Sequence, residues 1–133
     1  MKFQRITSNP FFASITLGLN KGYTDELFEK SFVISCIQDY HEQQIKSGLI
    51  PLSISITDCD IVFSGQAEPH LKLNFINYPK FPKEVNELKI QIENITLFLM
   101  DRLEQNRIVI EYTDETVMFE KSTEIDPRIN IKQ

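Results

Sequence analysis

The chain has 133 residues, of which 41% are hydrophobic and 25% are charged, and its formal net charge is −5. These values are typical of one soluble globular domain. The negative charge argues against nonspecific binding to nucleic acids or anionic membranes, because both need a basic surface. No apolar stretch reaches the ~20 residues of a membrane span, and no secretory signal pattern is visible. We therefore expect a cytoplasmic protein that binds neither nucleic acid nor membrane.

The first predicted elements are a strand over Phe12–Leu19 and a helix over Asp25–Ser47. From Ala13 onward the odd-numbered strand positions are apolar and the even-numbered ones are small or polar, which indicates one buried face. In the helix, apolar side chains recur every four residues and form a stripe that can cover this face. Gly48 is a suitable residue to end the helix.

A hairpin is predicted next. Residues 52–57 alternate between apolar and polar side chains, and residues 71–75 do the same. The alternation fails at Asp58-Cys59-Asp60, because three apolar residues follow in a row at 61–63. A β-bulge or a bend would explain this. Residues 64–70 (SGQAEPH) are typical of a turn-rich link between the two strands.

The second helix is predicted over Pro82–Gln105, with one main apolar stripe at helical spacing. Ile90 and Leu97 point away from that stripe, so the outer side of this helix favours a second partner. Two prolines precede the helix in the stretch FINYPKFP. Pro79 ends the strand before it, because proline cannot continue a paired ladder, and Pro82 suits the first turn of a helix.

The last predicted strand covers Arg107–Tyr112, and a short added strand at Val117–Phe119 can pair back onto it. The element order is β-α-β-β-α-β, which predicts an α+β, ferredoxin-like two-layer sandwich with both helices on one face of an antiparallel sheet. A related arrangement with closed trimer sheets is the main variant. The single domain is expected over residues 1–120, followed by a polar, mobile or partner-dependent tail at 121–133.

The sheet face turned away from the helices is predicted to be mostly small and polar, with Tyr78 as its only aromatic residue. RNA-binding domains of this topology stack bases on several aromatic residues there, so RNA binding is disfavoured. The face is then either solvated, packed in an oligomer, or the floor of a ligand cleft.

Glu68 and His70 are the first candidate catalytic residues. They are two positions apart near a strand start, where imidazole could carry a proton and the carboxylate could orient it. Asp58 and Asp60 are the candidate metal ligands, because alternate strand positions put both carboxylates on one side. Each pair also suits an ordinary structural role, as surface residues in a turn or as solvated acids at a bend.

Tyr78 and Lys80 are the candidate ligand-binding residues, because a rigid proline-flanked loop is a good place to hold a site. Cys36 and Cys59 lack metal-binding spacing and are expected to be reduced thiols. No phosphate loop, nucleophile elbow or zinc motif is present, so no cofactor is expected.

Two functions therefore remain open from the sequence. One is a non-enzymatic, self-associating binding or interaction protein, a dimer or trimer with a small-molecule or protein partner. The other is a small enzyme or metal-assisted site at the end of the sheet, built around His70, Glu68 and the pair Asp58/Asp60. In the second hypothesis Tyr78 and Lys80 would close one side of the site.

Overall fold

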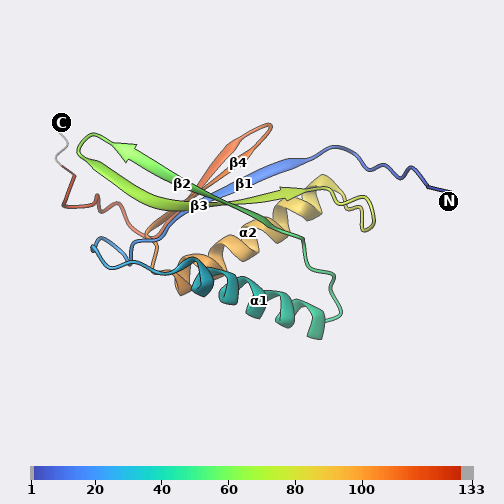
Figure 1. Cartoon of the computed structure of the whole chain (residues 1–133), viewed down its shortest axis with the longest axis horizontal. Helices are drawn as coiled ribbons and strands as arrows, with labels where there is room; N and C mark the ends of the chain where they lie inside the picture. Colours follow the sequence, from blue (N-terminus) through green and yellow to red (C-terminus); the bar gives the residue numbers. More distant parts are fainter. Residues whose placement is uncertain (1, 130–133) are drawn as a thin grey trace.

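The computed structural model describes residues 2–129 of the chain (Figure 1). Five strands and two helices follow in the order β1 (Phe12–Gly18), α1 (Lys30–Lys46), β2 (Ser55–Phe63), β3 (Gln66–Ile76), α2 (Val85–Arg102), β4 (Arg107–Tyr112) and β5 (Thr116–Glu120). The strands form one antiparallel sheet in the order β2-β3-β1-β4-β5. The predicted α+β two-layer fold is confirmed, with β5 as the added strand beside β4.

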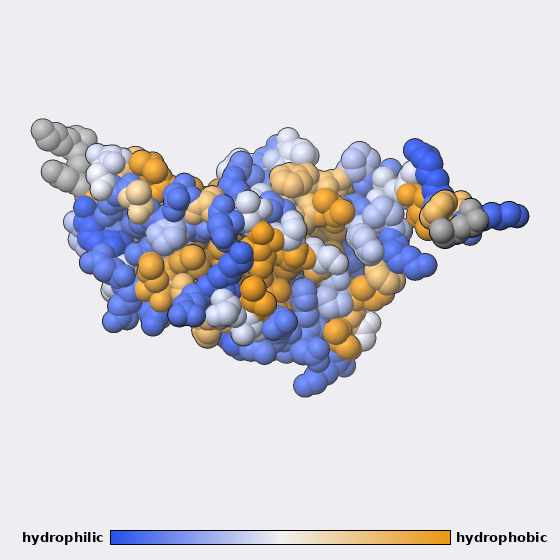
Figure 2. Space-filling model, in the orientation of Figure 1, coloured by the Kyte–Doolittle hydropathy of each residue, from blue (hydrophilic) through white to orange (hydrophobic). Residues whose placement is uncertain are grey.

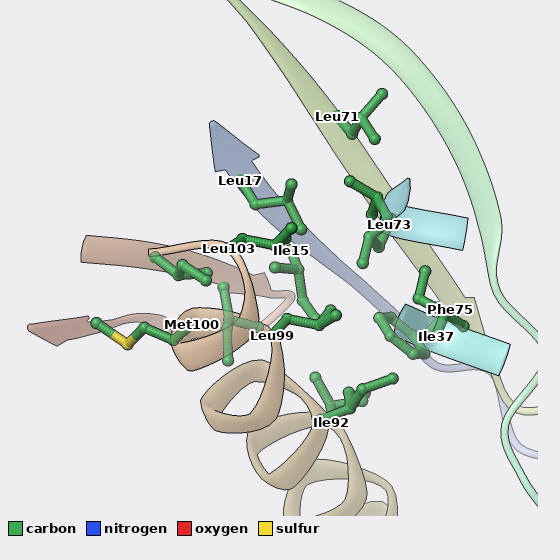
Figure 3. Packing of buried hydrophobic residues seen from close by; sticks show 14 of the residues in the cluster. Ile15, Leu17, Ile37, Leu71, Leu73, Phe75, Ile92, Leu99, Met100 and Leu103 are labelled. Atoms are coloured by element: carbon green, nitrogen blue, oxygen red, sulfur yellow. The ribbon is translucent and has the colours of Figure 1, made fainter. Parts of the chain in front are cut away.

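Both helices cover one face of the sheet, and the core lies between the two layers (Figure 1). The odd-numbered residues 13–17 of β1 and 71–75 of β3 are almost fully buried, as period-two alternation requires. Figure 3 shows Ile15 and Leu73 of these strands facing Ile92 and Leu99 of α2. The alternation in the sequence therefore identified the core face of the sheet correctly.

The start of α1 differs from the prediction. The helix begins at Lys30 rather than Asp25, because residues 20–29 form a hydrogen-bonded turn of their own. The Thr24 side chain donates to the Lys21 carbonyl at 2.6 Å and accepts from the Glu26 backbone N–H at 3.2 Å. Such side-chain bonds offer the backbone an alternative to the helix. At the other end, Gly48 has a φ of +79°, as expected of a helix-terminating glycine.

The hairpin also differs from the prediction. No bulge interrupts β2, whose pairing with β3 is continuous from Ser55↔Asn74 to Phe63↔Gln66. Only Ser64 and Gly65 form the turn, so β3 begins at Gln66 and includes Pro69. The three apolar residues at 61–63 are all exposed at the hairpin tip. The alternation lapses there because the tip extends past the helices, and neither face of it is buried.

Pro69 is compatible with β3 because of its position. A strand residue directs its N–H and its C=O to the same side, and the Pro69 carbonyl accepts from the Leu19 N–H at 3.1 Å. The proline nitrogen therefore faces the end of β1, one position beyond the last pair, Gly18↔His70. Its missing N–H costs little because the ladder ends there.

Within residues 2–129, no helix is both long enough and apolar enough to cross a lipid bilayer.

Candidate functional site

A cleft of about 250 Å³ opens on the sheet face that is turned away from the helices. It lies where the C-terminal end of β1 meets the N-terminal ends of β3 and β4, and the C-terminal segment forms one side of it. Both candidate catalytic residues, Glu68 and His70, line this cleft. They share it because even-numbered positions of β3 all project to the open face.

The His70 ring has a defined orientation. Its Nδ1 lies 3.1 Å from the Glu68 carbonyl oxygen. A carbonyl can only accept, so in the neutral imidazole Nδ1 carries the proton and Nε2 is free to accept one. The ring lies close to Gly18 across the strand pair, since a Cβ built on Gly18 would sit 3.3 Å from His70 Nε2 and 3.0 Å from Gln105 Oε1. Glycine at this position therefore makes room for the imidazole.

The Glu68 carboxylate is paired with a residue of the tail rather than with His70. Its Oε1 accepts from Arg128 Nη2 at 3.2 Å. The same guanidinium contacts Asp126, with Nη2 to Oδ2 at 2.7 Å, and Asp25, with Nη1 to Oδ1 at 2.9 Å. Arg128 therefore joins three carboxylates from three segments at the edge of the cleft, and its hydrogen bonds hold the pKa of Asp126 below the ordinary range.

Polar groups on the β4 side of the cleft converge on the Tyr23 hydroxyl. It accepts from Asn106 Nδ2 and from Arg107 Nη1, both at 2.9 Å, and donates to the Glu124 carbonyl at 3.1 Å. Gln105 Nε2 donates to the Asn20 carbonyl at 2.8 Å. The cleft wall is thus a hydrogen-bonded set of amide, phenol and guanidinium groups, while Ile61 and Phe63 of the hairpin supply apolar surface.

Asp58 and Asp60 do not join Glu68 and His70 in the cleft. Asp58 pairs with Leu71, a core residue, so its side chain projects from the helix-covered face of the sheet. There it forms an ion pair with Lys30 of α1 at 3.1 Å. Cys59, not its acidic neighbours, is on the open face opposite His70. Within residues 2–129, no cluster of three or more His, Cys, Asp or Glu side chains is arranged to hold a metal ion.

Tyr78 and Lys80 lie at the other end of the sheet. Ile76, the last residue of β3, is six positions along the strand from His70. At a rise of ~3.3 Å per residue, the two are about 20 Å apart. Tyr78 and Lys80 are therefore too far away to close one side of a site that contains His70. Their loop is held by Asn77, whose side chain donates to the carbonyls of Asn9 and Lys83 and accepts from the Lys83 N–H, at 3.0–3.1 Å.

Sequence reasoning missed Arg128, Asp126 and Tyr23. The predicted tail lies against the domain as far as residue 129, while residues 130–133 are outside the described part. Arg128 meets Glu68 and Asp25 across 60 and 103 residues of chain. The only local signal was Asp126-Pro127-Arg128, a turn-forming acid next to a base.

The middle of the open face is a ladder of small polar side chains. Ser14 donates to Asn74 Oδ1 at 3.1 Å, and Asn74 in turn donates to Thr57 Oγ1 at 3.1 Å. Lys72 and Glu111 form a loose ion pair at 3.9 Å. These groups satisfy one another across the strands, as buried or half-buried polar groups require.

Large apolar side chains are exposed at many points outside the cleft. Ile90 is 61% exposed and Leu97 47% exposed on the outer side of α2. Figure 2 shows apolar residues interspersed with polar ones over the face in view. The outer side of α2 is therefore uncovered in the single chain, as its sequence pattern predicted.

No known protein family matches this chain, and no curated protein matches it in sequence. Two solved structures have a similar fold. The first is a phage SAM lyase in complex with S-methyl-5′-thioadenosine, with a TM-score of 0.72, 14% identity, and coverage of 94% of this chain and 100% of that chain. The second is a phage SAM lyase in the apo state, with a TM-score of 0.71, 15% identity, and coverage of 93% and 100%. At these identities the likeness shows the fold alone.

Proposed function

We propose that the chain is a small enzyme that binds an S-adenosyl compound in the cleft and cleaves S-adenosylmethionine (SAM) to S-methyl-5′-thioadenosine (MTA). The observation that carries the proposal is the convergence of Glu68 and His70, with amide and aromatic groups, in one concave site. The fold shared with a SAM lyase selects the compounds to test first. It does not assign the activity, because one fold hosts many functions.

The cleft suits such a ligand in size and chemistry. Its volume of about 250 Å³ is close to the lower limit of roughly 300–1,000 Å³ for small-molecule sites. The amide of Gln66 and the Oε1 atom of Gln105 can hydrogen-bond a purine edge, and Phe63 offers an aromatic surface for stacking. The Glu68 carboxylate would attract the positive sulfonium of SAM once Arg128 is displaced.

The reaction requires a proton acceptor or an internal nucleophile. MTA forms when the bond between sulfur and the γ-carbon of the amino-acid chain breaks and the electron pair stays on sulfur. The four-carbon fragment must then lose a proton or be captured by its own carboxylate. His70 Nε2, left without the proton by the Nδ1 contact to the Glu68 carbonyl, can accept that proton. Glu68 would stabilise the sulfonium in the bound substrate.

Turnover of SAM, followed by liquid chromatography with detection of MTA, tests the proposal. We expect MTA above the buffer control for the wild type and at least a tenfold loss of MTA formation in His70→Gln, since proton transfer contributes ~10²–10⁴-fold. Glu68→Gln should instead weaken the binding of SAM, because it removes the charge that faces the sulfonium. Lys80→Gln, at the other end of the sheet, is the matched control and should retain full activity. If the wild type forms no MTA and binds neither SAM nor MTA by calorimetry, the proposal is wrong.

We also propose, as a second candidate, that the chain is a cytoplasmic protein that self-associates into a dimer or trimer. The exposed Ile90 and Leu97 on the outer side of α2 support it. Light scattering coupled to size-exclusion chromatography should show an oligomer in the wild type and a smaller species in Ile90→Glu. Lys80→Gln again serves as the control. A wild type that is a monomer at high concentration would contradict self-association.

A further inference from the structure

The C-terminal segment at residues 121–129, which we term the strap, is held in two parts. Residues 121–124 are bound by Asn106 and Tyr23, whereas residues 125–129 are tied to the domain mainly by Arg128. The guanidinium donates to Asp25 Oδ1 at 2.9 Å and to the Thr24 carbonyl at 3.0 Å, both in the connection between β1 and α1. It also donates to Glu68 Oε1 on β3 at 3.2 Å. One side chain therefore fixes the end of the strap to two separate parts of the domain.

Asp126 holds the guanidinium in the orientation that these contacts need. Its carboxylate accepts from Arg128 Nε at 3.0 Å and from Nη2 at 2.7 Å, and Oδ1 also accepts from the Arg128 backbone N–H at 2.9 Å. The Ile129 N–H closes the turn on the Asp126 carbonyl at 3.0 Å. Asp126 is only 7% exposed, so this pair is a preformed unit rather than a loose surface contact.

The strap lies at the cleft. Ile125, Asp126 and Ile129 form part of the cleft lining, and Glu68 lines it from the sheet. Phe63 of the hairpin tip and Arg128 border an adjoining hollow. The carboxylate that would meet a cationic ligand is therefore already occupied by a cation from the same chain.

We propose that Arg128 is an autoinhibitory latch of the cleft, which occupies the Glu68 carboxylate and which a cationic ligand must displace. This inference rests on the proposed function, because it takes Glu68 to be a ligand-binding group. SAM carries a positive sulfonium and competes with Arg128 for Glu68, whereas MTA is a neutral thioether and does not. Removal of the latch should therefore strengthen the binding of SAM selectively.

The test compares Arg128→Gln with Lys121→Gln. Both remove one positive charge from the strap, but Lys121 pairs with Asp101, away from Glu68, at 2.8 Å. In Arg128→Gln we expect faster hydrogen exchange over residues 125–129 and a SAM affinity about two- to fivefold higher, the range for one partly exposed ion pair. The affinity for MTA should be unchanged, and Lys121→Gln should resemble the wild type throughout.

A second readout does not depend on any substrate. Carbodiimide-driven labelling of carboxylates, read by mass spectrometry, should modify Glu68 faster in Arg128→Gln than in the wild type or Lys121→Gln. Unchanged exchange in the strap or unchanged labelling of Glu68 would overturn the latch. Equal effects of Arg128→Gln and Lys121→Gln would mean that the loss of any positive charge is enough, and this result would also overturn the latch. If no variant binds SAM or MTA while labelling of Glu68 responds to Arg128→Gln, the proposed function fails and the latch stands.

Discussion

Two segments of this molecule are each held by one polar side chain, but in different ways. The loop at residues 77–83 is held by Asn77, which is 6% exposed and forms three neutral hydrogen bonds. The end of the strap, residues 125–129, is held by Arg128, which is partly exposed and pairs with three carboxylates. Buried neutral bonds contribute to the stability of the whole fold. Partly exposed ion pairs mainly position a segment that can come away.

Asn77→Ala is expected to have the largest effect, because it removes a buried side chain and leaves the partly buried Lys83 N–H and the Asn9 carbonyl without their partner. We expect a loss of about 2 kcal/mol in the free energy of unfolding, measured by urea denaturation. Arg128→Gln should lose less than ~1 kcal/mol in the same measurement. Equal losses in the two variants would remove the distinction between the loop and the strap.

Gly18→Ala is expected to have an intermediate effect that is confined to the cleft. The new Cβ would meet the ends of the His70 and Gln105 side chains, which must shift by a few tenths of an ångström. We expect a loss of about 1 kcal/mol in stability, together with displaced NMR signals of the His70 ring and weaker MTA binding. Gly65→Ala is the control, because its Cβ would meet nothing within 4 Å. Unmoved His70 signals would show that Gly18 does not position the ring.

Acid pH is expected to have the smallest global effect, and its effect on the strap depends on Asp126. The hydrogen bonds from Arg128 lower the pKa of Asp126, so this carboxylate favours the closed strap while it is charged. Its contribution is complete above the ordinary aspartate pKa of ~3.9 and is lost as the pH falls through the lower value of the closed state. Amide NMR signals of residues 125–129 should stay constant from neutral pH to about 4 and change below it. Release of the strap near pH 6 would instead indicate control by a histidine.

The sequence predicted the features of this fold that depend on local pattern. The odd-numbered apolar positions of β1 and β3 identified the core face, and Pro79 follows the end of β3. Pro82 was wrongly assigned to the first turn of the second helix, because α2 begins at Val85, after Glu84 as its N-cap. Glu68 and His70 are two positions apart on β3, so their side chains project from the same face of the sheet and line the same cleft. These inferences depend on the alternation of side chains over a few neighbouring residues, and the tertiary contacts of the folded chain agree with that alternation.

The rest of the candidate site depended on long-range geometry. A bulge or bend was expected at Asp58-Cys59-Asp60, which left the side to which the two acids project open, but the pairing of β2 with β3 is continuous. A two-residue turn places Cys59 opposite His70 and turns both acids to the other face. Arg128 could not be matched to Glu68 because 60 residues separate them and no pattern of spacing links them. Contacts of this kind follow from the assembled sheet and not from any segment.

NMR mapping of MTA binding on the labelled wild type tests the central claim most directly. If the cleft binds an S-adenosyl compound, titration with MTA should shift the amide signals of Gly18, Glu68 and His70, and leave those of Tyr78, Lys80 and Phe81 in place. No shift at saturating MTA, or shifts confined to the loop at residues 77–83, would contradict the account.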